Sequence, residues 1–189
     1  MHTEDDTLAR EDFMKSVLIF LRGNSASGKS TTAKLLQKHF REGTLLVSQD
    51  MFRIKMLNVR DTPANLSHDL IRQIVEYGKG KCRYVILEGI LNTGRYGDML
   101  KELIHYFDNR THMYYFDLTL EETIKRHNTR DKKYDFGEDS LRAWFVPHDR
   151  LRVADEKVFT DETTQEEILG TVLRDVRLAS SRKICQDGF

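Results

Sequence analysis

Residues 23–30, with the sequence GNSASGKS, fit the Walker A pattern G-x-x-x-x-G-K-[ST] at every fixed position. An apolar run at residues 17–21 precedes the motif and predicts a buried strand, and the pattern of residues 29–40 predicts a helix after it. A strand, a glycine-rich turn and a helix in this order are the context that gives the motif its physical meaning. The sequence therefore predicts a phosphate-binding loop, and the rest of the fold has to support it.

The residue types of the loop suit a triphosphate. Gly23 and Gly28 let the backbone curl so closely that successive N–H groups point inward, and the following helix N-terminus adds partial positive charge. Lys29 supplies a compact cation for the β- and γ-phosphates, and Ser30 offers a hydroxyl to Mg²⁺. The predicted cofactors are ATP and Mg²⁺. The residues predicted to bind them are Gly23, Asn24, Ser25, Ala26, Ser27, Gly28, Lys29, Ser30 and Thr31.

Length and composition predict one globular domain. The chain has 189 residues, of which 39% are apolar and 32% charged, which is enough for a core. We expect an acidic leader at 1–15, a phosphate-loop domain at 16–178 with a lid at about 121–137, and a frayed tail at 179–189. The acidic start and the lack of an apolar run of about 20 residues predict a cytoplasmic protein with no membrane partner.

The charge balance restricts the partners. Lys plus Arg number 30 and Asp plus Glu also number 30, so no global field attracts nucleic acid or an anionic membrane. Any anion site must be local. The two cysteines, Cys82 and Cys185, lie far apart without a pattern, which argues against a disulfide or a zinc site. The sequence does not indicate an oligomeric state.

Strand and helix patterns alternate along the chain. Further strands are predicted at 44–48, 84–88, 112–118 and 157–160. Helical patterns are predicted at 51–58, 66–78, 99–107, 121–128, 141–145 and 168–176. This alternation predicts an α/β fold with a mainly parallel five-stranded sheet and helices on both faces, which is the P-loop nucleoside triphosphate hydrolase fold.

Ligands of an open α/β sheet bind at the carboxyl ends of its strands, so acidic residues at those ends are candidates for chemistry. Asp50 follows the second predicted strand and precedes Arg53 by three residues. Its carboxylate is placed to accept the proton of an attacking hydroxyl, with Arg53 orienting it or contacting the phosphate. The alternative is that Asp50 only caps the following helix and Arg53 is solvated.

Glu88 and Asp117 end two further strands. Glu88 stands where an acidic residue of the Walker B type would order Mg²⁺ or contact the acceptor, so Ser30 and Glu88 are the predicted metal residues. The alternative for Glu88 is a structural hydrogen bond to a neighbouring loop. Asp117 is predicted to be a capping or turn residue.

Two arginines mark the predicted lid. Arg126 and Arg130 are four residues apart on a helix, with Lys132 and Lys133 close behind, so a basic flap could close over the γ-phosphate. The alternative is local pairing of Arg126 with Glu122. Trp144 is expected in the core rather than against a base. The predicted catalytic residues are Lys29, Asp50, Arg53, Arg126 and Arg130.

The order of these features resembles a known group of enzymes. The Walker A motif is followed by residues 48–53 (SQDMFR), 85–89 (VILEG), 117–119 (DLT) and 125–130 (KRHNTR). Over about residues 16–178 the chain resembles the small P-loop kinases grouped with the polynucleotide 5′-hydroxyl kinases, the zeta-toxin kinases and the chloramphenicol phosphotransferases. The resemblance implies that Asp50 activates the acceptor hydroxyl, that Arg53 assists, and that Arg126 contacts the phosphates. It also implies an adenine site near the lid and near residues 160–164.

The resemblance implies an ATP-dependent phosphotransferase with an alcohol group as acceptor. A small molecule such as a nucleoside, a sugar nucleotide or an antibiotic is the favoured acceptor, with residues 53–67 and 90–97, including Arg95 and Tyr96, shaping its pocket. A nucleic-acid 5′-hydroxyl stays open as an alternative, although the neutral charge does not favour it. A nucleotide-dependent switch is less favoured, because the sequence has neither an N-K-x-D stretch nor a D-x-x-G element between its strands.

Overall fold

The computed structural model describes residues 16–129, 136–153 and 155–181. For residues 179–181 it describes the backbone alone. The leader at 1–15, Arg130 with Lys132 and Lys133, and most of the predicted tail lie outside the described residues. The sheet has five parallel strands in the order β2-β3-β1-β4-β5. The strands are β1 (Val17–Gly23), β2 (Thr44–Ser48), β3 (Tyr84–Gly89), β4 (Thr111–Phe116) and β5 (Glu156–Phe159).

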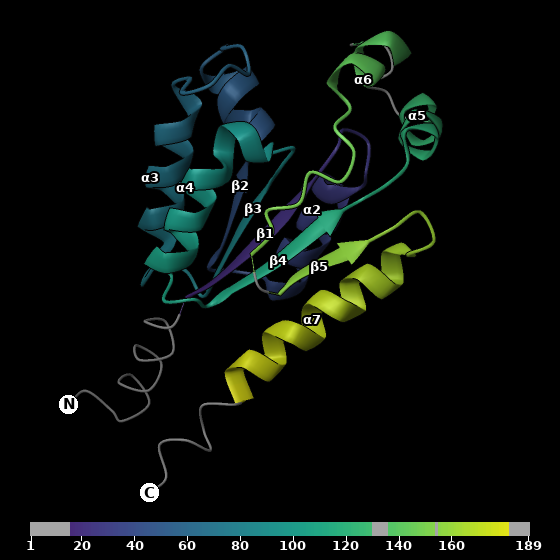
Figure 1. The fold of residues 1–189 in the computed structure, drawn as a ribbon. Helices are drawn as coiled ribbons and strands as arrows, with labels where there is room; N and C mark the ends of the chain where they lie inside the picture. The colour runs from purple at the N-terminus through teal and green to yellow at the C-terminus, as the bar shows by residue number, and fades with distance from the viewer. Residues whose placement is uncertain (1–15, 130–135, 154, 182–189) are drawn as a thin grey trace, which may run out of the picture.

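Helices connect the strands and cover both faces of the sheet (Figure 1). They are α2 (Lys29–Phe40), the π-helix η1 (Met51–Met56), α3 (Ser67–Gly78), α4 (Thr93–Tyr106), α5 (Leu120–Asn128), α6 (Glu138–Trp144) and α7 (Gln165–Ser181). The predicted α/β class, the five parallel strands and the two helical layers are confirmed.

Four helices begin or wind differently from the prediction, and two of them, α6 and α7, begin three residues early, at Glu138 and Gln165. Helix α4 begins at Thr93 rather than 99, because the side chain of Asn92 accepts a hydrogen bond from Gly94 N at 3.0 Å and caps its first turn. The predicted helix at 51–58 is a π-helix, in which Leu57 N donates to Phe52 O at 3.0 Å, five residues back.

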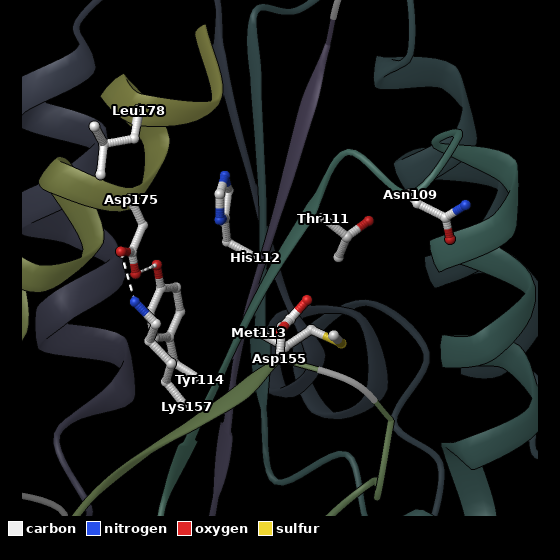
Figure 2. A pocket seen from close by; sticks show the side chains of 9 residues that line it. All are labelled: Asn109, Thr111, His112, Met113, Tyr114, Asp155, Lys157, Asp175 and Leu178. Carbon is white, nitrogen blue, oxygen red and sulfur yellow. Dashed lines mark hydrogen bonds and ion pairs between the residues drawn. The ribbon is translucent and has the colours of Figure 1, made fainter. Parts of the chain in front are cut away.

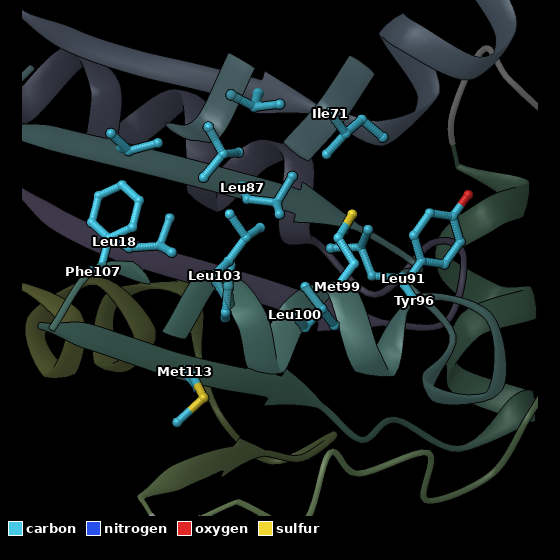
Figure 3. Packing of buried hydrophobic residues seen from close by; sticks show 14 of the residues in the cluster. Leu18, Ile71, Leu87, Leu91, Tyr96, Met99, Leu100, Leu103, Phe107 and Met113 are labelled. Atoms are coloured by element: carbon cyan, nitrogen blue, oxygen red, sulfur yellow. The ribbon is translucent and has the colours of Figure 1, made fainter. Parts of the chain in front are cut away.

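The central strand β1 separates two apolar clusters. Its side chains alternate, so that Leu18 and Phe20 face α3 and α4 while Ile19 and Leu21 face α2 and α7. Figure 3 shows the first cluster, where side chains of α3 and α4 pack on the sheet. All seven residues of β1 are buried, including the five of the apolar run at 17–21 for which a buried strand was predicted. Burial on both faces fixes the strand that leads into the phosphate loop.

Helix α6 lies beyond the sheet, beside α5 (Figure 1). Leu141 is its buried residue, whereas 52% of the surface of Trp144 is exposed. The prediction that Trp144 belongs to the core was therefore wrong. The physical reason is that no face of the sheet lies beneath this short helix, and the indole instead packs on the ring of Phe136 at 5.1 Å. Among the described residues, no helix has the length and apolar character of a membrane span.

Candidate active site

The phosphate loop curls tightly between β1 and α2. Gly23 has a φ of 142°, and a Cβ there would lie 2.5 Å from the carbonyl oxygen of Phe116. Gly28 has a φ of 101° directly before α2. Ala26 adopts a φ of 64°, which the sequence did not predict because this conformation is uncommon for a residue with a Cβ. Left-handed residues of this kind turn backbone N–H groups toward one side of a loop.

Lys29 begins α2 and is largely buried, with 6% of its surface exposed. Its Nζ donates hydrogen bonds to the carbonyl oxygen of Asn24 at 2.6 Å and to Ser27 Oγ at 3.1 Å. The ammonium group is thus held inside the curl of the loop. Ser25 is partly buried, while Ser30 and Thr31 are exposed at the first turn of the helix.

Glu88 connects the phosphate loop with β2. Its Oε2 accepts a hydrogen bond from Ser30 Oγ at 2.9 Å, and its Oε1 accepts one from Ser48 Oγ at 2.6 Å. The residue is 5% exposed and stands opposite both Leu21 of β1 and Ser48 of β2 in the sheet register. The structure therefore brings together Ser30 and Glu88, the two predicted metal residues, and adds Ser48, which the sequence analysis missed. Its signal was its place at the end of a strand, two residues before Asp50.

Asp50 and Arg53 lie at the start of η1. Arg53 Nη2 is 3.7 Å from Asp50 Oδ1, and the two side chains are 19% and 48% exposed. Arg53 Nη1 donates to the carbonyl oxygen of Val59 at 3.3 Å, and its buried Nε has no hydrogen-bond partner among the described residues. The side chain of Asp50 makes no capping hydrogen bond to η1 in the described part of the chain. The geometry thus supports an Asp50–Arg53 pair rather than a helix cap.

Arg126 of α5 reaches the phosphate loop. Its Nη1 donates to the carbonyl oxygen of Ser27 at 3.3 Å, and its Nε donates to Glu122 Oε1 at 2.7 Å. The local pairing with Glu122 is therefore present, and the side chain also reaches the phosphate loop; its contact with the phosphates stays a prediction. The hydrogen bond from Arg126 lowers the pKa of Glu122. Arg130 was predicted to act beside it and lies outside the described residues.

The start of α5 is capped by Thr119, whose Oγ1 accepts a hydrogen bond from Glu122 N at 3.2 Å. Asp117, predicted as the cap or turn residue, instead places its Oδ2 2.8 Å from His148 Nδ1. The loop at 160–164, where the adenine site was predicted, joins α5 through Asp161, which accepts hydrogen bonds from Thr119 N at 3.0 Å and Thr119 Oγ1 at 2.6 Å.

The two segments predicted to bind the acceptor contact each other. Arg95 Nη1 lies 3.2 Å from Asp61 Oδ2, and the hydroxyl of Tyr96 donates to Asp61 Oδ1 at 2.9 Å. Tyr96 is fully buried and its ring stacks on His68 at 4.0 Å. Burial raises the pKa of Tyr96. Tyr96 therefore holds the loop at 57–66 against α4 from within the core.

Arg22 is a further residue that the sequence analysis missed. It is fully buried at the end of β1, and its Nη1 pairs with Glu156 Oε1 at 2.7 Å. Its Nη2 donates to the carbonyl oxygen of Leu91 at 3.1 Å and lies 3.5 Å from Asp149 Oδ2. The signal in the sequence was an arginine that directly follows the apolar run at 17–21. A buried cation needs acidic or carbonyl partners, so its position indicates a buried network of ion pairs and hydrogen bonds.

A pocket of about 450 Å³ lies at the opposite, amino-terminal edge of the sheet, beside the end of α7 (Figure 2). There Asp175 accepts hydrogen bonds from the hydroxyl of Tyr114 at 2.8 Å and from Lys157 Nζ at 2.6 Å. Burial lowers the pKa of His112, which also lines this pocket. None of the predicted site residues lies there, so the pocket is distinct from the candidate active site.

Comparison with known proteins identifies the fold. No protein-family model matches the chain, and no curated protein sequence matches it significantly. Among solved structures, it is similar to a gluconokinase from Sinorhizobium meliloti, with a TM-score of 0.64 and 13% identity over 92% of this chain and 98% of that one. It is also similar to an APS kinase of Mycobacterium tuberculosis in complex with AMPPNP and APS, with a TM-score of 0.61 and 16% identity over 85% and 96% of the chains.

A third similar structure is a tunicamycin resistance protein from Deinococcus radiodurans, with a TM-score of 0.56 and 14% identity over 85% of this chain and 95% of that one. The match extends over most of each chain. At these identities the comparison establishes the fold that the chain shares with these structures, and the chemistry of this chain has to be argued from its own residues.

Proposed function

We propose that this chain is an ATP-dependent kinase that transfers the γ-phosphate of ATP to a hydroxyl group of a small molecule. One observation carries the proposal. The carboxylate of Glu88 binds Ser30 of the phosphate loop on one side and Ser48, two residues before Asp50, on the other. Ser30, a candidate metal residue, and the strand end that leads to Asp50, the candidate base, thus lie on the two sides of Glu88, which supports the proposal because phosphoryl transfer uses a metal ion and a base near the same phosphate.

The residues present fit magnesium and a triphosphate. Mg²⁺ prefers oxygen ligands, and the Ser30 hydroxyl and Glu88 carboxylate meet at 2.9 Å beside the loop. Left-handed backbone at Gly28 and Ala26 and the buried ammonium group of Lys29 suit the phosphates. When bound, MgATP would supply the transferable phosphoryl group and a divalent charge. Ser30 and Glu88 would hold the metal, and Lys29 would neutralise the phosphates.

Transfer to the acceptor needs a base for the acceptor hydroxyl and positive charge near the transferred phosphoryl group. The acceptor oxygen forms a bond to the γ-phosphorus while the bond from that phosphorus to its bridging oxygen breaks. The acceptor proton passes to the carboxylate of Asp50, which Arg53 orients from 3.7 Å away. Arg126, anchored on Glu122 and in contact with the loop at Ser27, places positive charge where the transferred group passes. We propose that Arg130 adds to this charge.

A small acceptor is favoured by two considerations. The charges of the chain are balanced, with 30 basic and 30 acidic residues, so no net positive charge attracts a nucleic acid. Two of the similar solved structures are described as a gluconokinase and an APS kinase, and the names of both denote kinases of small molecules. A polynucleotide 5′-hydroxyl as acceptor is the second candidate, favoured by the D-x-x-R element and lid arginine of the sequence.

The test is ATP consumption with Mg²⁺ against a panel of nucleosides, sugars, antibiotics and 5′-hydroxyl oligonucleotides. Asp50→Asn is compared with Asp98→Asn, because Asp98 pairs with Lys101 at the same three-residue spacing and at 3.7 Å but is 98% exposed on α4. We expect one acceptor to be phosphorylated and Asp50→Asn to lower turnover by about 100-fold or more while ATP still binds. Asp98→Asn should behave as the wild type. Turnover by Asp50→Asn at the wild-type rate would contradict the assigned base.

A further inference from the structure

One asparagine of the phosphate loop contacts the chain just after α6, the helix that together with α5 we name the lid helices. Asn24 Nδ2 donates a hydrogen bond to the carbonyl oxygen of Val146 at 2.8 Å, and Val146 N donates one to Asn24 Oδ1 at 3.0 Å. The two residues are 122 positions apart in the sequence, and Asn24 is 5% exposed. Its amide therefore pairs with both backbone groups of a residue that lies two positions after the end of α6.

The segment after α6 is fixed to the sheet along its length. We name residues 145–153 the lid–β5 linker. Asp149 N donates to the hydroxyl of Tyr115 at 2.9 Å, and Asp149 Oδ2 accepts a hydrogen bond from Thr93 N at 2.9 Å. Leu151 is buried, and its N–H donates to Glu156 Oε2 at 2.8 Å. The linker is thus attached to the sheet and to the start of α4 through Asp149 and Leu151, and Val146 lies near its other end, next to α6.

A continuous set of contacts leads from Val146 through the lid to Arg126. Trp144, two residues before Val146, packs on Phe136 at 5.1 Å, and Phe136 stacks on His127 at 4.6 Å. His127 Nε2 also lies 2.8 Å from the carbonyl oxygen of Phe136. His127 is adjacent to Arg126, whose Nη1 donates to Ser27 O in the phosphate loop. Arg126 of α5 and Val146, which lies just after α6, are therefore both hydrogen-bonded to the phosphate loop.

We infer that Asn24 is a positioning residue, which couples nucleotide binding in the phosphate loop to the placement of Arg126 and the lid helices through its pair of hydrogen bonds with Val146. The inference rests on the proposed function, because it assumes that a nucleotide enters the loop. It assigns a role to a position that the Walker A pattern leaves variable, and the reason lies in the hydrogen-bond geometry of the amide.

The side-chain type fits this role. A carboxamide has a donor and an acceptor side by side, which match the C=O and N–H of one backbone residue. Alanine at this position removes both bonds. Aspartate keeps the acceptor alone and adds a negative charge beside the phosphates. The contact is made to the backbone of Val146, so Val146→Ala keeps both bonds and is the matched control for Asn24→Ala.

The chain contains a reporter for the coupling. Trp144 is the single tryptophan of the sequence. It is half exposed and lies two residues before Val146, which is hydrogen-bonded to Asn24. Its fluorescence is measured while MgATP is added to the wild type, Asn24→Ala and Val146→Ala, with ATP affinity determined separately by calorimetry. We expect MgATP to change the emission of the wild type and of Val146→Ala. In Asn24→Ala we expect the change to fall at least about 5-fold while ATP still binds.

Kinetics give a second readout. We expect Asn24→Ala to lower kcat about 10- to 100-fold, the range that a misplacement of about 1 Å costs, with the KM for ATP changed less. If Asn24 acts through Arg126, the effects of Asn24→Ala and Arg126→Ala on kcat will not multiply in the double variant. A residue that only stabilises the fold would give independent effects.

Hydrogen exchange of the wild type keeps the inference testable even if Asn24→Ala does not fold. We expect MgATP to slow exchange in residues 145–149 by at least about 5-fold. ATP binding without a response of Trp144 and of this segment, or an Asn24→Ala variant with the wild-type response, would overturn the coupling and leave the proposed function intact. Failure of ATP to bind in calorimetry would overturn both.

Discussion

The buried network around Arg22 gives the sharpest prediction for stability. Arg22 is completely inaccessible, and its guanidinium pairs with Glu156 at 2.7 Å and with Asp149 at 3.5 Å. The two carboxylates are only 4% and 15% exposed, so neither is well solvated without the cation. Replacing Arg22 by methionine keeps a long side chain but leaves these charges buried without their partner.

The expected loss is about 3–5 kcal/mol in the free energy of unfolding, the range for removing one partner of a buried ion pair. It is a large part of the roughly 5–15 kcal/mol that stabilise an ordinary domain. Arg72→Met is the matched control, because Arg72 pairs with Asp69 at 3.6 Å but the two side chains are 40% and 79% exposed. We expect this variant to lose less than about 1 kcal/mol.

Urea unfolding followed by circular dichroism measures both variants. A double variant, Arg22→Met with Glu156→Gln, should regain about 1–3 kcal/mol relative to Arg22→Met, because one of the stranded charges is removed. A loss for Arg22→Met no larger than that for Arg72→Met would refute the reasoning. It would mean that water or a rearranged side chain solvates Glu156 once the arginine is absent.

Three more predictions concern the site and the effect of pH. In Glu88→Gln, we expect the Mg²⁺ concentration for half-maximal turnover to rise about 10- to 100-fold in a metal titration, and an unchanged value would remove Glu88 from the metal site. In Arg126→Lys, we expect kcat to fall nearly as far as in Arg126→Ala, because lysine has one donor nitrogen in place of the separate Nε and Nη1 that contact Glu122 and the loop, and wild-type kinetics of the lysine variant would disprove this. Burial lowers the pKa of His112 below its ordinary value of 6.5, so the unfolded chain binds more protons and the free energy of unfolding should fall as the pH drops below about 6.5. Denaturation at pH 7.5 and 5.5 should show a smaller loss for His112→Gln than for the wild type, and equal losses would contradict the assignment.

Local sequence patterns were sufficient to predict the parallel sheet and the phosphate loop. The apolar run of β1 and the glycines of the loop determine a buried strand and a tight turn from a few adjacent residues, and the structure has both. The alternation of strand and helix predicted a parallel sheet, and parallel strands bring their carboxyl ends to one edge. Asp50 and Glu88 could therefore be placed at the same edge without knowledge of the strand order.

The start of α4 was not readable for a physical reason. Gly94 and Gly97 weaken the helical pattern at 93–98, because glycine disfavours helix interiors. The helix forms there nonetheless, since Asn92 caps it and the buried side chains of Tyr96 and Met99 pack on the sheet. Tertiary packing outweighs the local propensity.

Contacts between polar groups far apart in the sequence were out of reach of pattern reasoning. Asn24 stands at a variable position of the motif, and Val146 contributes only backbone atoms to their contact. The types of these two residues therefore do not predict that they are hydrogen-bonded to each other. Trp144 was misplaced for a related reason, because an apolar side chain predicts burial only if a core face lies opposite. What lies opposite depends on the path of the whole chain.

The strand order explains why Glu88 has the central place in the site. Strand β3 lies between β2 and β1, although it follows both in the sequence. Its last residues therefore stand beside Ser48 on one side and beside the strand that enters the phosphate loop on the other. Side chains alternate along a strand, so a shift of β3 by a single residue would turn Glu88 away from both serines. The buried residues that set the register of β3, Val85 and Leu87 on one face and Ile86 on the other, hence also set the geometry of the proposed metal site.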